Sequence, residues 1–189
     1  AYASTHDASF QKTAASIVAF VHTHLRHPDG LLMTGVDADS EGEEGTFYYW
    51  SEAELVSVLG RPLSDIRGYF ATQALGNVPD EASGEYRGNN VLTIQRADEP
   101  NTEAWYEQAF DVLRLARAKR PHPGIDHKVL LEWNACWASA LSTAAVWLDR
   151  VDWLHEATRI LDRLWLGFRR ADGGLWQVCT DGEYRERAT

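Results

Sequence analysis

An acidic segment that runs into a group of aromatic residues offers the densest set of side chains that could do chemistry. Residues 37–45 contain five carboxylates and two glycines, and residues 46–50 follow with four aromatic side chains. Carboxylates this close together need hydrogen-bond donors, solvent, a cation or protonation to relieve their repulsion. An exposed acidic turn before an edge strand is one interpretation, and the aromatic strand 46–50 favours a second, the wall of a binding site. We expect residues 37–45 to form a loop ordered by hydrogen bonds, because the glycines permit tight turns.

The acidic segment also matches part of a calcium-binding loop. Asp37, Asp39, Glu41 and Gly42 occupy positions one, three, five and six of the EF-hand pattern. Position twelve is Tyr48, where the bidentate glutamate belongs. The sequence therefore predicts no EF-hand, and no metal or cofactor is expected, although casual binding of a cation to this loop stays open.

A second candidate group lies between residues 126 and 134. Its chemically useful side chains are Asp126, His127, Lys128, Glu132, Trp133 and Asn134. A base that removes a proton beside a carbonyl could be His127 or Asp126. Glycoside hydrolysis would need two carboxylates that flank the scissile bond, and the sequence does not select the pair. The available carboxylates are Asp37, Asp39, Glu43, Glu44, Asp126 and Glu132. The structural alternative for Asp126 is a cap on the N-terminus of the following helix.

Apolar spacing predicts helices along most of the chain. Two amphipathic stripes should each be buried. They consist of Phe10, Ala14, Ile17, Val21 and Leu25 near the start, and of Leu154, Ala157, Leu161, Leu164, Trp165 and Phe168 near the end. Further helices are predicted over residues 51–60, which begin with a capping box, and over residues 63–71, 102–119 and 129–148. The last is apolar nearly all round, which indicates a helix buried between neighbours.

One supersecondary unit occurs twice. Residues 24–32 follow the first long helix and residues 168–176 follow the last, and each copy has an arginine, an Asp-Gly turn and a short apolar strand. Helical hairpins whose connecting turns carry small strands are typical of (α/α) toroids. We therefore predict an all-α chain that is a fragment of an (α/α) toroid, with short β-hairpins in the loops between helices.

Composition disfavours several classes of function. The chain has 189 residues, of which 44% are hydrophobic, and this suits one folded domain. A formal net charge of −10 disfavours nucleic acid and anionic membrane surfaces as partners. Polar residues within the apolar stretch 129–148 argue against a membrane span. Cys136 and Cys179 form no C-x-x-C motif, so a reducing, cytoplasmic environment is expected.

Three motifs carry a resemblance to a known family. They are residues 35–50 (GVDADSEGEEGTFYYW), residues 88–92 (GNNVL) and residues 126–134 (DHKVLLEWN). In these motifs and their order the chain resembles the thioredoxin-domain-containing, spermatogenesis-associated (YyaL-like) family. The resemblance implies a six-hairpin (α/α) barrel similar to those of N-acylglucosamine 2-epimerases and certain glycosidases. Residues 1–189 would form part of that barrel domain, and the thioredoxin-like domain that precedes the barrel in the family has no counterpart in this chain.

The chain departs from the family pattern at two positions. His127 stands where the family has a second aspartate, and Ala135 stands where it has a glycine. A six-hairpin barrel also needs roughly twice this many residues, so we expect a fragment that exposes apolar helix faces. It should rest on the remainder of a larger chain or pair with a second copy.

The leading functional hypothesis is a domain that binds or processes carbohydrate, with isomerase-like or glycosidase-like chemistry implied by the resemblance. Aromatic faces and carboxylates are groups that hold sugars. The residues expected to catalyse are Asp126, His127 and Glu132, and those expected to bind substrate are Asp37, Asp39, Glu43, Glu44, Trp50, Lys128, Trp133 and Asn134. We expect them to meet in one cleft, although the spacing of Trp133, Trp137 and Trp165 also fits a helical core. The alternative function is a non-catalytic scaffold or interaction module.

Overall fold

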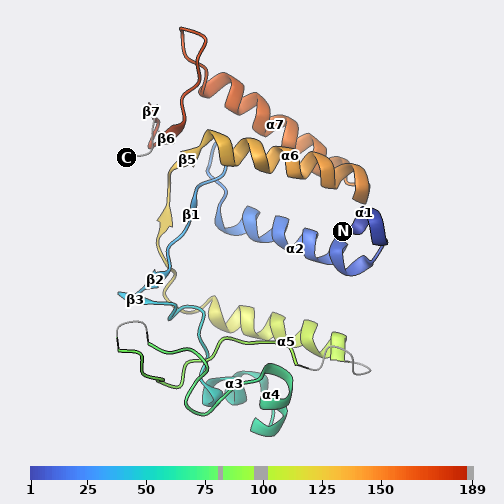
Figure 1. The fold of residues 1–189 in the computed structure, drawn as a ribbon, viewed down its shortest axis with the longest axis vertical. Helices are drawn as coiled ribbons and strands as arrows, with labels where there is room; N and C mark the ends of the chain where they lie inside the picture. Colours follow the sequence, from blue (N-terminus) through green and yellow to red (C-terminus); the bar gives the residue numbers. More distant parts are fainter. Residues whose placement is uncertain (81–82, 96–101, 187–189) are drawn as a thin grey trace. The chain divides into compact units, whose positions relative to one another are not determined.

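The computed structural model describes residues 1–80, 83–95 and 102–186, which form two compact units. The first unit consists of residues 1–37 and 125–189, and the second of residues 38–124. Figure 1 shows both units as ribbons.

Helices dominate the first unit. They are α1 (Tyr2–Thr5), α2 (Ala8–His24), α6 (Leu131–Leu148) and α7 (Val151–Gly167). Helices α6 and α7 form an antiparallel hairpin and pack along each other (Figure 1). The apolar core between the helices contains Val18 of α2, Ala138 and Leu141 of α6, and Ile160 and Leu164 of α7. The long helices of this unit therefore share one core.

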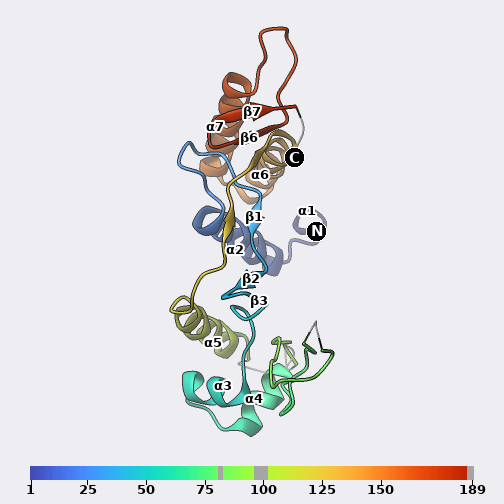
Figure 2. The same ribbon diagram turned by 90° about the vertical axis from the view of Figure 1, so that its left-hand side faces the viewer.

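Short strands connect these helices. Strand β1 (Gly35–Val36) pairs with β4 (Ile125–Asp126), and β5 (Val129–Leu130), β6 (Val178–Thr180) and β7 (Glu183–Arg185) form an antiparallel sheet (Figure 2). The helix predicted over residues 129–148 is therefore wrong in its first two residues. Val129 and Leu130 extend to pair with β6, and the helix begins at Leu131.

The repeated turn of the sequence is confirmed. In the first copy the amide of Leu31 donates to the Asp29 carboxylate at 3.0 Å, and in the second the amide of Gly174 donates to Asp172 at the same distance. Each copy also closes an isolated antiparallel bridge, Arg26 with Leu32 and Arg169 with Leu175. The Asp-Gly sequence thus builds the same side-chain-stabilised turn at both places.

The second unit has its own core. It contains β2 (Asp39–Ser40), β3 (Glu43–Glu44), α3 (Glu52–Leu59), α4 (Leu63–Phe70) and α5 (Thr102–Arg117). Helix α3 begins after the predicted N-cap residue, where the Ser51 hydroxyl accepts from the amide of Glu54 at 3.2 Å. This is one half of the predicted capping box, and the Glu54 carboxylate pairs with Arg120. The core consists of Trp50, Leu55, Ile66, Phe70, Tyr106, Ala109 and Leu113.

The acidic segment is a tight hairpin. Glu41 and Gly42 have φ values of 57° and 82°, which suit the two central residues of a type I′ turn. Strands β2 and β3 flank this turn, and the amide of Gly45 donates to the carbonyl of Ala38 at 3.0 Å. The prediction that hydrogen bonds order this segment is confirmed. The predicted strand over residues 46–50 is wrong, because residues 45–49 form a turn and only Trp50 pairs, with Asn90.

The fold class is confirmed in its coarse form, a mostly helical protein with small antiparallel sheets. The two predicted stripes are only partly buried. Phe10 and Ile17 of α2 and Leu154, Leu161 and Trp165 of α7 are exposed. These helices carry apolar residues on more than one face, and the unit covers only part of each circumference. None of the helices in the described ranges combines the length and apolar character that a membrane-spanning segment requires.

Arg120 connects separate segments of the second unit through hydrogen bonds. Its guanidinium donates to the carbonyls of Phe47 and Tyr49 at 2.7 and 2.8 Å, and to the Glu54 carboxylate at 2.7 Å. It also lies 4.1 Å from the centroid of the Trp50 ring. One side chain thus joins the turn after the acidic hairpin to helix α3 and to the core.

We expect Arg120→Met to lower the free energy of unfolding by about 3 kcal/mol, because a hydrogen bond to a charged group contributes about 1.5–3 kcal/mol. Arg120→Lys should recover only part of this loss, since one ammonium cannot reproduce the guanidinium fork. Arg114→Ala is the matched control, because Arg114 is exposed and forms a surface ion pair with Asp111. Urea denaturation checks all three variants, and equal effects of the Arg120→Met and Arg114→Ala changes would contradict the prediction.

Candidate functional site

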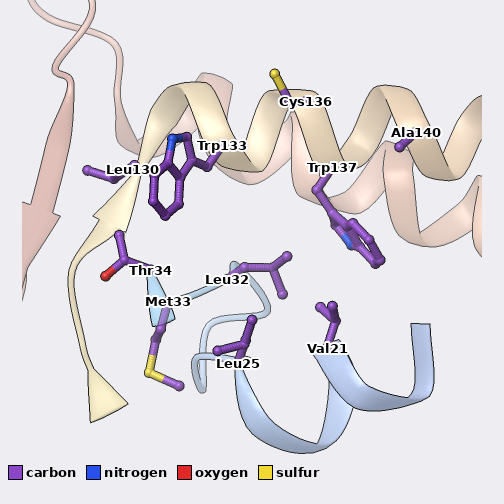
Figure 3. Close-up of a pocket in the computed structure, with 10 residues that line it drawn as sticks. All are labelled: Val21, Leu25, Leu32, Met33, Thr34, Leu130, Trp133, Cys136, Trp137 and Ala140. Atoms are coloured by element: carbon purple, nitrogen blue, oxygen red, sulfur yellow. The ribbon is translucent and has the colours of Figure 1, made fainter. Parts of the chain in front are cut away.

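A cleft of about 400 Å³ lies in the first unit. Helix α2 and the turn after it contribute one side, and the end of β5 with the first half of α6 contributes the other (Figure 3). Its lining residues are Val21, Leu25, Leu32, Met33, Thr34, Leu130, Trp133, Cys136, Trp137 and Ala140. Most of these side chains are apolar, and the hydroxyl of Thr34 donates to the carbonyl of Asp126 at 3.1 Å, which leaves it an acceptor for a ligand.

Two tryptophans project from α6 toward this cleft (Figure 3). Trp133 is 56% exposed, so the alternative that its spacing places it in a helical core is wrong. Trp137 is half-buried, and within the described part of the chain its buried indole N–H has no hydrogen-bond acceptor. Trp133 therefore offers a large aromatic surface to solvent beside an apolar cleft.

Asn134 of α6 holds the turn after α2, which forms the side of the cleft opposite α6. Its side chain is 1% exposed. The side-chain oxygen accepts from the amide of Leu32 at 2.7 Å, and the side-chain nitrogen donates to the carbonyls of Leu32 and Leu130 at 3.0 and 2.9 Å. The amide thus pairs with Leu32 as a neighbouring strand would, and this fixes the turn residues against α6. These contacts define Asn134 as a positioning residue in this unit.

The Asp126 carboxylate is held in an ion pair. It lies 2.7 Å from the Lys128 ammonium and also accepts from the Lys128 backbone amide at 3.2 Å. The hydrogen bond from Lys128 lowers the pKa of Asp126, and slight desolvation opposes this only in part. The alternative that Asp126 caps the following helix is wrong, because it lies in β4 and Leu130 is the N-cap residue of α6. His127 and Glu132 are exposed in the same stretch of chain.

The acidic hairpin places its carboxylates at the surface of the second unit. Asp39, Glu43 and Glu44 are exposed, and Asp39 lies opposite Glu44 in the hairpin register. Trp50 is 4% exposed, and Arg120 lies over its ring. These contacts give Trp50 a place in the core of that unit. Asp37 is exposed and belongs to the first unit.

The structure brings together only some of the predicted site residues. Lys128, Trp133 and Asn134 share the first unit with Asp126, His127 and Glu132. The acidic hairpin and Trp50 belong to the second unit, so a cleft common to both groups stays a prediction. Within the described ranges, no group of three His, Cys, Asp or Glu side chains could hold a metal ion.

Sequence reasoning missed the side of the cleft that α2 and its turn contribute. Leu25 lies within the first copy of the repeated unit, Met33 and Thr34 directly follow it, and Val21 precedes it by three residues in α2. The repeat was therefore the signal that could have drawn attention to them. The linking role of Arg120 had no local signal, because its partners lie some seventy residues earlier in the sequence.

These features define a mostly helical protein with small antiparallel sheets, and comparison with known proteins identifies its relatives. No family model matches the chain. It is similar to human spermatogenesis-associated protein 20, with 27% identity over an aligned region that covers 93% of this chain and 26% of that protein. It is also similar to the uncharacterized protein B0495.5 of Caenorhabditis elegans, with 26% identity over 161 residues that cover 71% of this chain and 22% of that protein.

The resemblance predicted from the three motifs is confirmed, and the chain is a homologue of spermatogenesis-associated protein 20. It spans about a quarter of the length of these curated relatives.

We expect Asn134→Ala to lower the free energy of unfolding by about 3 kcal/mol, because unsatisfied buried backbone groups cost about 1–3 kcal/mol each. Thr143→Ala on the same helix is the control, since its hydroxyl bonds to the Ser139 carbonyl at an exposed position. That change should stay within about 0.5 kcal/mol. Urea denaturation measures both variants, and a neutral Asn134→Ala change would show that the amide does not hold the turn.

Lys128→Met should raise the pKa of Asp126 toward 3.8, its ordinary value, because the change removes the main cause of the lowered pKa. Since the folded-state pKa is lowered, the ion pair stabilises the fold above the unfolded-state pKa, and its contribution is lost as the pH falls through the folded-state pKa. Carboxyl-carbon NMR titration measures the shift, with Lys119→Met as the control. An unchanged pKa of Asp126 in the Lys128→Met variant would contradict the assigned cause.

Proposed function

We propose that this chain contributes a carbohydrate-binding wall to a larger protein, with Trp133 as its aromatic platform. The observation that carries the proposal is the 56% exposed Trp133 ring at the edge of an apolar cleft of about 400 Å³. Aromatic rings stack on the apolar C–H faces of sugars, and a few polar groups fix the orientation. The Thr34 hydroxyl and the Lys128 ammonium are polar groups of this unit that could supply such contacts.

Binding is better supported than catalysis for the residues of this chain. An acid or base that works near neutral pH needs a pKa close to that pH. The ion pair with Lys128 moves the pKa of Asp126 in the opposite direction. Isomerase-like or glycosidase-like chemistry would therefore depend on His127, on Glu132 or on carboxylates from the acidic hairpin or the rest of the longer protein.

The proposed setting is an (α/α) barrel of the six-hairpin type. It is supported by the repeated turn after α2 and after α7, and by the homology to spermatogenesis-associated protein 20. A second candidate function, a non-catalytic interaction module, is favoured by the exposed apolar side chains. Among them are Val146 and Trp147 of α6 and Trp165 and Leu166 of α7.

Two tryptophans of helix α6 allow a matched test of sugar binding. Trp133 lines the cleft and is 56% exposed, whereas Trp147 is 53% exposed and does not line it. Each would be changed to alanine, and binding of N-acetyl-D-glucosamine and of D-glucose to the 189-residue chain would be measured by calorimetry. Trp133→Ala should weaken binding by at least about tenfold, which corresponds to about 1.4 kcal/mol.

Trp147→Ala should leave sugar binding unchanged, and both variants should lose less than about 1 kcal/mol of stability because both rings are exposed. Equal effects of the two changes on binding would contradict the assigned platform. Absence of binding of either sugar to the unchanged chain would favour the interaction module instead.

A further inference from the structure

The internal repeat extends beyond the Asp-Gly turn into the helices that precede it. Each residue of the first copy corresponds to the residue 143 positions later, so that Arg26 matches Arg169. The same spacing relates the amide of Met33, which donates to Leu25 at 2.8 Å, to the amide of Trp176, which donates to Phe168 at 2.8 Å. Helix α2 is therefore the counterpart of α7.

The turn before each of these helices is also the same. His6 ends α1 with a φ of 55°, and its counterpart Asp149 ends α6 with a φ of 53°. The amide of His6 donates to the carbonyl of Tyr2, and the amide of Asp149 donates to its counterpart, the carbonyl of Ala145. Helix α1 thus corresponds to the last turn of α6.

The two copies differ in what covers the long helix. In α7, Trp153 and Ile160 are 3% and 1% exposed, and they share a core with Ala138 and Leu141 of α6. Their counterparts in α2 are Phe10 and Ile17, which are 41% and 51% exposed. Part of the face that α6 covers on α7 is therefore open on α2, at Phe10 and Ile17, whereas Val21, the counterpart of Leu164, is buried.

We propose that the α2 face formed by Phe10 and Ile17 is a docking surface for a helix like α6. This helix would continue from α1, run antiparallel to α2 and present small apolar residues, as Ala138 does to α7. The existing contact between α1 and α2 is the last turn of that interface. The chain spans about a quarter of the length of its relatives, and a protein of that length has room for such a helix.

A grafted helix tests this surface directly. Residues 131–143 of α6 would be placed before Ala1 of the complete chain, so that Ala1 takes the position of Ala144 and α1 becomes the last turn of the graft. The graft should raise the midpoint of thermal unfolding by at least about 4 °C, because a domain of this size gains about 2–4 °C for each kcal/mol of stability. A graft in which the copies of Ala138 and Leu141 are changed to lysine should give no rise.

Two substitutions on α2 separate the proposed face from the rest of the helix. Ile17→Lys should abolish the rise in the grafted chain and leave the midpoint of the ungrafted chain unchanged, because Ile17 is exposed there. Phe20→Lys is the matched control, since Phe20 is 47% exposed and its counterpart in α7 is Arg163, also exposed. It should leave the rise intact.

Three results would overturn the proposal. They are no rise with the intact graft, a rise that Ile17→Lys does not reduce, and a rise that Phe20→Lys reduces equally. Sedimentation of the ungrafted chain tests whether a second copy of the chain, and not the proposed helix, covers this face. If Ile17→Lys abolishes a dimer while the graft gives no rise in the midpoint, the face binds a second copy and the proposed helix is wrong.

Discussion

The amide of Asn134 supplies hydrogen bonds that the short strands of the first unit cannot. The turn after α2 pairs over very few residues, so its backbone groups need partners from side chains. The Asn134 side chain accepts a hydrogen bond from the N–H of Leu32 and donates one to its carbonyl, and these bonds fix the turn against α6. The cleft beside Trp133 exists because these two elements are held together. In the second unit, Asn77 pairs with Val91 and Asn90 with Gln73 in the same way.

Local sequence signals predicted much of the fold. The N-cap at Ser51, the Asp-Gly turns and the helical periodicity act through neighbours in the sequence, and all appear in the structure. The strand predicted over residues 46–50 failed because Gly45, with a φ of 75°, starts a turn that overrides the β-propensity of the aromatic residues. The prediction that the apolar helix faces are buried was wrong at Ile17 and Trp165. Helical periodicity identifies an apolar face but does not show which neighbouring element covers it.

The sequence predicted some residues of the candidate site, but it did not predict which of them are exposed and which are buried. The motif at residues 126–134 led to the prediction that Trp133 and Asn134 belong to the site. The sequence alone did not show that the Trp133 ring is exposed and the Asn134 amide is buried. Their different roles follow from the helix, since Trp133 faces the cleft and Asn134 faces the core. The ion pair of Asp126 with Lys128 then favours binding over acid–base chemistry in this stretch. The exposed apolar helix faces fit a chain that works as part of a larger assembly.

Binding of a sugar to the Trp133 ring is the step on which the proposed function depends. A crystal structure of the protein with N-acetyl-D-glucosamine bound would test it most directly. We expect a sugar ring stacked on the indole of Trp133, with the Thr34 hydroxyl within hydrogen-bond distance. A cleft filled by protein side chains, or a sugar bound only at residues away from Trp133, would contradict it.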